Sequence, residues 1–348
     1  MLDAYIDRIR AAHADGTPLV IQGGGSKAFY GNAGAGEILD TRALTGVVDY
    51  QPKELVLTAR AGTPLAEVEA LLAEQNQMLA FEPPHFGGAA TLGGSIAAGL
   101  SGPRRPYAGA ARDFVLGVRM IDGTGQPLRF GGQVIKNVAG YDVSRLMVGA
   151  LGTLGLITEV SLKVLPKPAA ETTLQFELDE AAVILKMNQW AGQPLPLSAT
   201  SWHAGMLTVR LSGAASAVQA AQARLGGEAL NDAPAFWQRL RDQATPFFDK
   251  RPLWRLAVKP TTPPLKLGDA QWIEWGGAVR WLASDRPATT LREAAKAAGG
   301  HATLFRGKAP ADGVFTPLAP ALLTLHRKLK QRFDPKGVLN RGRLYPDF

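Results

Sequence analysis

The chain has 348 residues, a hydrophobic content of 46% and a formal net charge of +8, so it has room for roughly two to three domains with buried cores. No apolar run approaches the roughly 18 residues that span a bilayer, and the absence of cysteine excludes disulfides, thiol catalysis and an iron–sulfur cluster held by this chain. The basic residues are scattered and no nucleic-acid-binding motif accompanies them, so we expect no nucleic-acid partner.

A helix and a strand are the first predicted elements. Residues 1–16 are amphipathic, and because acids interrupt them and no apolar core follows, we expect a helix rather than a signal peptide, and a cytoplasmic protein. Leu19 to Gln22 is predicted as a buried strand that runs into Gly23-Gly24-Gly25-Ser26-Lys27. Such a loop can cradle a phosphate, although it matches neither a P-loop nor a GxGxxG motif. A plain glycine turn between two strands is the alternative.

Strands are predicted next at 43–50 and 55–59, followed by a helix that Thr63 caps and Pro64 opens. A further strand at 114–121 turns at Asp122-Gly123 and returns at 128–130. A small-residue region then leads into a strand at 156–164.

The stretch Glu82 to Gly109 is rich in Gly, Ala, Ser and Thr. Glycine lacks a Cβ, so its backbone can approach a ligand closely. The run Thr91 to Ser95, together with Ser101 and Gly102, presents N–H groups under small side chains, and a diphosphate requires such donors. A small-residue helix packed tightly in a core is the alternative.

The second half is predicted to be an α+β region that follows a proline-rich hinge at 166–168. Strands are expected at 174–178, 197–203, 206–211, 253–258, 279–283 and 302–305, and helices at 180–190, 214–225, 237–248 and 289–298. Trp272, Trp275 and Trp281 are expected to lie in a core or at an interface. His301 and Arg306 are the candidate catalytic residues of this region, with a surface strand as the alternative.

Four motifs occur in one order: QGGGSKAFYG, PPHFGGAATLGGSIAAGLSGPRR, KNVAGYDVSRLMVGALGTLGLITEVSLKVLP and, near the end, FDPKGVLNRGR. Together they resemble the FAD-linked oxidases, the family typified by vanillyl-alcohol oxidase and D-lactate dehydrogenase, and within it the smaller flavin-binding subunits of bacterial glycolate oxidases. The resemblance implies an α+β fold with a two-part FAD-binding domain of the PCMH type. That domain would span 1–168, an α+β cap domain 169–316, and a C-terminal segment returning to the flavin domain 317–348.

The resemblance also implies which residues bind FAD. Backbone N–H groups of two glycine loops would hold the diphosphate, Arg104 would offset its charge, and Pro83 would fix an extended approach beside the flavin ring. The implied set is Gly23, Gly24, Gly25, Ser26, Lys27, Pro83, Thr91, Gly93, Gly94, Ser95, Ser101, Gly102, Arg104, Lys136, Asn137, Gly140, Tyr141, Asp142, Gly149, Gly152, Thr153, Leu154, Ile157, Asn340 and Arg343.

Two departures from the family pattern shape the expected chemistry. Covalent members carry a histidine where this chain has Ser26, and no cysteine is present, so we expect non-covalent FAD. Many 2-hydroxy acid members carry a paired-histidine metal motif, whereas the five histidines here stand apart, so we expect no metal site. The lack of that motif favours a flavin-bearing relay subunit over a subunit that oxidises the substrate itself.

The function implied by the resemblance is that of an FAD-binding subunit of a glycolate (2-hydroxy acid) oxidase complex, which takes part in oxidising glycolate to glyoxylate and relays electrons. A self-sufficient dehydrogenase, with a cap histidine or arginine holding the carboxylate, and a non-catalytic assembly subunit are the alternatives. The expected partners are a second FAD-binding subunit and an iron–sulfur subunit, with at most peripheral membrane association through them. The segment 272–281 and the basic helix 326–332 are expected docking surfaces.

Overall fold

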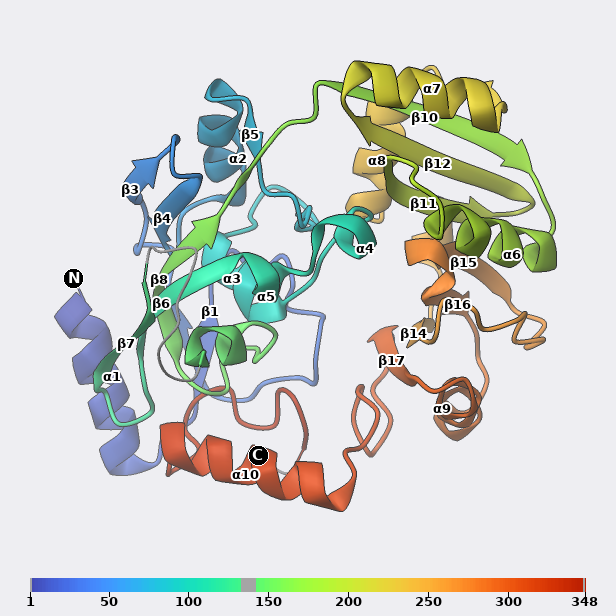
Figure 1. Cartoon of the computed structure of the whole chain (residues 1–348). Coiled ribbons are helices and arrows are strands. Elements are labelled where there is room, and N and C mark those ends of the chain that lie inside the picture. The colour runs from blue at the N-terminus through green and yellow to red at the C-terminus, as the bar shows by residue number, and fades with distance from the viewer. Residues whose placement is uncertain (1, 133–141, 347) are drawn as a thin grey trace.

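The computed structural model describes residues 2–132, 142–346 and 348, and it confirms the predicted α+β class (Figure 1). One body carries the N-terminal half and the last helix, and a second body carries the strands coloured from yellow-green to orange-red. Among the described residues, no helix is both long and apolar enough to cross a bilayer.

A five-stranded antiparallel sheet is the centre of the first body. Its order is β3 (Val47–Gln51), β4 (Val56–Arg60), β8 (Leu156–Lys163), β6 (Val115–Ile121) and β7 (Pro127–Gly131). Alternate residues of β8 are buried, as expected for a strand with one face on a core. The elements that pack around it are α1 (Leu2–Asp15), α2 (Leu65–Glu74), α3 (Leu92–Ala98), α5 (Ala111–Phe114) and the 3₁₀ turn Val143–Met147. The short helix α4 (Arg105–Ala108) follows α3 in the chain and packs on β11 (Leu197–His203) of the second body.

The start of α2 differs from the prediction. Pro64, not Thr63, occupies the N-cap position, and its side chain makes no capping hydrogen bond. The hydroxyl of Thr63 instead accepts a hydrogen bond from the N–H of Gly46 at 3.0 Å. The threonine therefore ties the helix start to the loop before β3.

The end of the chain lies beside its beginning. β1 (Leu19–Gln22) pairs in parallel with β2 (Glu37–Asp40), and its other edge meets the C-terminal segment. Leu19 donates to the carbonyl of Val338 at 2.7 Å, and the N–H of Asn340 donates back to Leu19 at 2.9 Å. A shared apolar cluster includes Ile9 of α1, and α10 (Pro320–Phe333) brings the chain to this position. A pair of two-residue strands, β5 (Gln77–Met78) and β9 (Leu165–Pro166), closes this body.

The second body is built on one eight-stranded antiparallel sheet. Its order is β13 (Glu228–Ala229), β10 (Ala170–Glu177), β12 (Met206–Gly213), β11 (Leu197–His203), β15 (Ala270–Glu274), β16 (Val279–Ala283), β14 (Leu253–Ala257) and β17 (His301–Arg306). Its helices are α6 (Glu180–Ala191), α7 (Ala215–Leu225), α8 (Ala233–Arg241) and α9 (Ala288–Ala297), with 3₁₀ turns at Pro246–Asp249 and Trp275–Gly277. The helix predicted at 237–248 was wrong, because α8 ends at Arg241 and a separate 3₁₀ turn follows.

The two bodies share an apolar interface. Ala98, Leu100 and Leu151 of the first body belong to one buried cluster with Trp237 and Trp281 of the second. Trp272 and Trp281 are only 7% and 6% exposed, so the expectation of an aromatic docking surface at 272–281 was wrong for these side chains. They face the interior because alternate positions of β15 and β16 point toward this interface.

Candidate functional site

The glycine loop after β1 lines a cavity of about 120 Å³. The loop is held by Ala28 N–H donating to Gly25 O and Tyr30 N–H donating to Lys27 O. Within the described part of the chain, no protein oxygen accepts a hydrogen bond from the N–H groups of Gly24, Gly25, Ser26 or Lys27. A concave run of such donors is suited to an anion.

Lys27 is the buried lysine of this cavity. Its side chain is only 8% exposed, and its ammonium lies 3.3 Å from the Ser26 hydroxyl and over the ring of Phe86. Burial lowers its pKa to about 8, an effect that the more distant Asp242 partly opposes. Among the described residues no carboxylate pairs with the Lys27 ammonium, and a buried cation of this kind is stabilised by an incoming anion. Lys27 and the loop donors therefore fit the diphosphate of FAD.

The second loop lies against the first. Gly23 and Gly24 are so close to residues 89–91 that an added Cβ would lie 2.4 Å from Thr91 Oγ1 or 1.4 Å from Ala89 O. Thr91 caps α3 by accepting from Gly94 N–H at 3.2 Å, and both residues line the small cavity. Gly23 and Gly24 are therefore needed for the two loops to pack against each other, because a larger residue would clash with the second loop.

Protein acceptors already occupy the first N–H groups of α3. Leu92 donates to Thr63 O and Gly93 to Ala61 O, at 2.9 and 2.7 Å. Ser95 is buried, and its hydroxyl donates to Thr91 O at 3.0 Å. In the structure the Gly93 N–H ties the start of α3 to the residue after β4, while the Ser95 hydroxyl bonds back to the N-cap residue of its own helix. That these two residues bind diphosphate stays a prediction.

Asn340 and Arg343, from the C-terminal segment, also line the small cavity. The Asn340 side chain accepts from Ile21 N–H at 2.7 Å and donates to the carbonyl of Leu151. Arg343 donates to the carbonyls of Asn32 and Ala28, both at 2.7 Å. These side chains are engaged with the protein, so they position the loop and the segment around Leu151.

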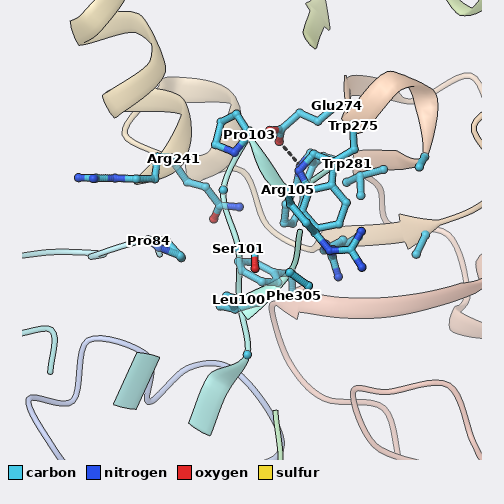
Figure 2. Close-up of a pocket in the computed structure, with 18 of the residues that line it drawn as sticks. Pro84, Leu100, Ser101, Pro103, Arg105, Arg241, Glu274, Trp275, Trp281 and Phe305 are labelled. Carbon is cyan, nitrogen blue, oxygen red and sulfur yellow. Dashed lines mark hydrogen bonds between the residues drawn. The ribbon is translucent and has the colours of Figure 1, made fainter. Parts of the chain in front are cut away.

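A larger cavity, of about 440 Å³, lies between the two bodies (Figure 2). The first body contributes Pro84, Ser101, Gly102 and Gly149, and the second contributes β14 to β17 and the turn after β15. The two cavities adjoin along the chain, since Ala98 lines the small one and the next residue, Gly99, lines the large one.

Two arginines, Arg105 and Arg255, line this larger cavity. The guanidinium of Arg105 lies 4.5 Å from the ring centroid of Trp275, and that of Arg255 lies 4.9 Å from the same ring. Burial lowers the pKa of Arg105, and the neighbouring charges of Arg255 and Arg112 lower it further. Burial also lowers the pKa of Arg255, while Tyr30 and Glu274 act in the opposite direction. Two cations thus share one indole at the cavity wall.

Glu274 is the buried acid of this cavity. It is 6% exposed, and its Oε1 accepts a hydrogen bond from Trp281 Nε1 at 2.6 Å, as Figure 2 shows. Burial raises its pKa to about 7, while the Trp281 hydrogen bond and Arg255 act in the opposite direction. The carboxyl therefore changes charge near neutral pH.

His301 and Arg306 lie at different places on β17. His301 lines the larger cavity, and burial and Arg255 lower its pKa. Arg306 lines neither cavity. Its guanidinium lies 4.4 Å from the ring centroid of Phe29 and donates to the Gln243 side chain, and burial lowers its pKa to about 10.

Arg104 has partners other than the expected phosphate. It is buried and ion-paired with Glu82 at 3.4 Å and with Glu171 of β10 at 2.8 Å. Arg210 of β12 contacts the same Glu82 at 2.8 Å. Arg104 thus belongs to a buried network that joins the two bodies.

The remaining predicted residues are spread around these cavities. Pro83 is buried beside Pro84, Asp142 forms an exposed ion pair with Arg145 at 2.7 Å, and an added Cβ on Gly152 would lie 2.7 Å from the Asn340 amide. The Thr153 hydroxyl donates to Ala150 O, and Leu154 and Ile157 pack in the core of the first body. Lys136, Asn137, Gly140 and Tyr141 lie outside the described residues.

Sequence reasoning missed Arg105, Arg255, Trp275 as an arginine platform, and Glu274. The signal available for Glu274 was an acid between two tryptophans, Trp272 and Trp275, in an otherwise apolar run. Arg255 is a single charged residue with apolar neighbours on both sides in a predicted strand, and it gives no such signal. Over the described residues, no cluster of His, Cys, Asp and Glu is arranged to hold a metal ion.

Comparison with known proteins gives matches along the chain. The model of the family described as FAD binding domain matches residues 2–131. Glycolate oxidase subunit GlcE of Escherichia coli (strain K12) is 49% identical over 99% of this chain and 97% of its own length. Glycolate oxidase subunit GlcD of Bacillus subtilis (strain 168) is 32% identical over 45% of this chain and 34% of its own length.

Solved structures agree on the fold. Crystalline p-cresol methylhydroxylase with substrate bound superimposes with a TM-score of 0.72 at 14% identity, covering 99% of this chain and 87% of that one. An alkyldihydroxyacetonephosphate synthase superimposes with a TM-score of 0.66 at 16% identity, covering 96% of this chain and 74% of that one. The TM-scores show the shared PCMH-type fold. The near-full-length match at 49% identity shows more: the chain belongs to the family of glycolate oxidase subunit GlcE, within the FAD-linked oxidoreductases.

Proposed function

We propose that this chain is the FAD-binding subunit of a glycolate oxidase complex and takes part in the oxidation of glycolate to glyoxylate. The observation that carries the proposal is the buried Lys27 in a loop of unengaged N–H donors, in a cavity that adjoins a larger one between the two bodies. The name and near-complete coverage of the 49% identical relative support the substrate.

The residues of the chain have distinct parts in this proposal. FAD, when bound, supplies a two-electron acceptor for oxidation at the carbon next to the carboxylate. Gly24 to Lys27 bind its diphosphate, while Asn340 and Arg343 keep that loop in place. Since Ser26 stands where covalent family members have histidine and cysteine is absent, the flavin is held without a covalent bond.

The proposed boundaries are 1–168 for the FAD-binding domain, 169–316 for the cap and 317–348 for the returning segment. The change from the five-stranded to the eight-stranded sheet between β9 and β10 supports the first boundary. The pairing of β1 with residues 338–340 supports the assignment of the last segment to the flavin domain.

The proposed complex contains a second flavoprotein and an iron–sulfur protein, and it acts in the cytoplasm with membrane contact only through partners. The similarity to two differently named glycolate oxidase subunits supports more than one kind of subunit. One-electron transfer from reduced flavin calls for carriers such as iron–sulfur clusters, which need cysteine ligands that this chain lacks.

A second candidate function is that this subunit oxidises a 2-hydroxy acid itself. The observation in its favour is the larger cavity between the two bodies. It is lined by Arg105, Arg255 and His301, which could bind the carboxylate of the acid. The experiment that separates the two functions mixes the isolated FAD-loaded chain with glycolate or D-lactate without oxygen. A relay subunit leaves the flavin absorbance unchanged, whereas rapid bleaching assigns the oxidation to this chain.

Assembly is tested by tagging the chain in its native cells and identifying the proteins that copurify. We expect a second flavoprotein, an iron–sulfur protein and glycolate oxidation in the same fraction. Recovery of the chain alone, as a monomer or homodimer with full glycolate activity, contradicts the hetero-oligomer. A complex without glycolate oxidation contradicts the proposed substrate.

A further inference from the structure

The wall of the larger cavity contains a backbone outlier at Trp275. Its φ is +57°, a left-handed conformation that is rare for a bulky residue and costs roughly 1–3 kcal/mol. The turn is held in place from several sides: Gly276 N–H donates to the Thr200 hydroxyl at 2.9 Å, and the buried Arg280 donates to Gly277 O at 2.9 Å. Such over-determined strain is typical of functional sites.

The indole ring of Trp275 is in contact with two arginine side chains. Arg105 comes from α4 of the first body and Arg255 from β14 of the second, and both lie within 5 Å of the Trp275 ring centroid. Figure 2 shows Arg105 beside Trp275. Among the described residues neither arginine has a carboxylate within ion-pair distance, whereas Arg241, which lines the same cavity, is paired with Asp242 at 2.9 Å.

Because neither guanidinium is ion-paired within the described part of the chain, both can bind a small anion. Two like charges that are partly desolvated at one cavity wall are stabilised by an anion that contacts both of them. Arginine suits a carboxylate, because its planar N–H groups match the two oxygens. Because the arginines come from different bodies, a bridging carboxylate would contact the flavin domain and the cap at once.

Glu274 adds a second recognition element next to this pair. It directly precedes Trp275 and lines the same cavity, and one of its oxygens is committed to Trp281 Nε1. A carboxyl held in this way has its other oxygen available to accept a hydrogen bond from a hydroxyl group. An arginine pair beside a hydroxyl acceptor fits an acid with a hydroxyl next to its carboxylate.

We propose that Arg105 and Arg255, stacked on Trp275, bind the carboxylate of a short 2-hydroxy acid and that Glu274 accepts a hydrogen bond from its hydroxyl. The inference rests on the proposed function, which it deepens by assigning a binding site for the acid to this subunit. Neither arginine and no acidic residue of this cavity was among the predicted site residues.

Direct binding to the full-length, FAD-loaded chain tests this site. Glycolate and acetate, which differ by one hydroxyl, are titrated by calorimetry and by tryptophan fluorescence under anaerobic conditions at millimolar concentrations, the upper range of ordinary substrate affinities. We expect the native chain to bind glycolate more tightly than acetate, roughly tenfold for one charge-assisted hydrogen bond.

Three variants identify the residues. Arg105→Gln is expected to lower the affinity for both glycolate and acetate by about tenfold or more. Glu274→Met, of similar volume, is expected to remove the preference for glycolate over acetate. Arg119→Gln is the matched control: its arginine lies on β6, does not line this cavity, is 57% exposed and pairs with Glu159 at 3.2 Å, so binding should be unchanged. Melting curves confirm that each variant is folded.

Three results overturn the site: a native chain that binds neither anion, an Arg105→Gln variant that binds both with native affinity, or a Glu274→Met variant with an undiminished preference for glycolate. The glycolate activity of the complex is measured separately. If the complex oxidises glycolate while this chain binds none, the site is refuted and the proposed function stands. If the complex lacks that activity, the function fails whatever the chain binds.

Discussion

Lys330 and Asp334 form a buried ion pair at the end of α10, with Nζ 2.7 Å from Oδ2. The ammonium also donates to Thr153 O at 2.8 Å and to Leu339 O at 2.7 Å. The carboxylate in turn accepts from the N–H groups of Val338 and Leu339. This ion pair therefore connects α10 to Thr153 and to residues 338–339, which lie alongside β1.

Replacing this lysine should be costly for stability. Lys330→Met leaves the Asp334 carboxylate buried without its cation, and removing one partner of a buried pair costs roughly 3–5 kcal/mol. Urea unfolding measures the loss. Lys328→Met is the control, because Lys328 is exposed on the same helix and should change stability by less than about 0.5 kcal/mol. Equal stability of the two variants would refute the structural role of the pair.

Lys27→Met should weaken FAD binding by roughly tenfold to a hundredfold, because a charge-assisted hydrogen bond contributes about 1.5–3 kcal/mol. A bound diphosphate stabilises the ammonium and raises the Lys27 pKa above its free value of about 8. Native affinity should therefore fall as pH rises through that value, while the affinity of Lys27→Met should not show this fall. Fluorescence titration of the flavin-free chain from pH 7 to pH 9.5 measures both, and parallel curves would exclude Lys27 as the group that titrates.

Gly24→Ala tests the contact between the two loops. The added Cβ would be placed 1.4 Å from the carbonyl oxygen of Ala89, so the backbone must move, at a cost of at least about 1–3 kcal/mol. We expect a lower melting temperature and loss of FAD during purification. Gly88→Ala is the matched control, since its Cβ meets nothing within 4 Å. Full flavin content in Gly24→Ala would show that the loop tolerates the displacement.

Glu274→Gln should change how stability depends on pH. Burial raises the folded pKa of Glu274 to about 7 from an ordinary 4.5, with Glu82 adding to this and Trp281 and Arg255 opposing it. Between these values the folded state holds a proton that the unfolded chain has released, so stability falls as pH rises through this range. The penalty is complete above pH 7, at roughly 3 kcal/mol.

The glutamine variant should therefore be more stable than the native chain at pH 8 and of similar stability near pH 4.5. Urea unfolding of the flavin-free protein at the two pH values measures the difference. Glu67→Gln, at an exposed position of α2, provides the baseline for losing one carboxylate. A stability difference that does not vary with pH would rule out a raised pKa at Glu274.

Sequence patterns predicted elements best where a strand is buried on one face or bounded by clear turns. The strand at 197–203 and the helix at 180–190 match β11 and α6 within one residue. β2 was missed because three of its four residues are exposed, so no alternation marks it. β15 was missed because it is short and directly follows a loop that ends in Gly268 and Asp269, and its first residue is exposed.

The candidate site was predictable only in part for a similar reason. The glycine loop at 23–27 is contiguous in sequence, so its donors could be recognised together. The larger cavity unites Arg105 of α4 with Arg255 of β14, and nothing in either local sequence indicates that they share a tryptophan. Residues such as Gly93 and Arg104 carry the right chemistry for phosphate, but tertiary packing gives their polar groups protein partners.

The hydrogen bond between Ile21 and Asn340 spans 319 positions of the chain. During synthesis, β1 and its glycine loop leave the ribosome long before residues 338–340, which form hydrogen bonds with β1. Contacts of such long range form late in folding. Flavin uptake should therefore follow completion of the polypeptide, and nascent chains stalled before residue 338 should fail to retain FAD.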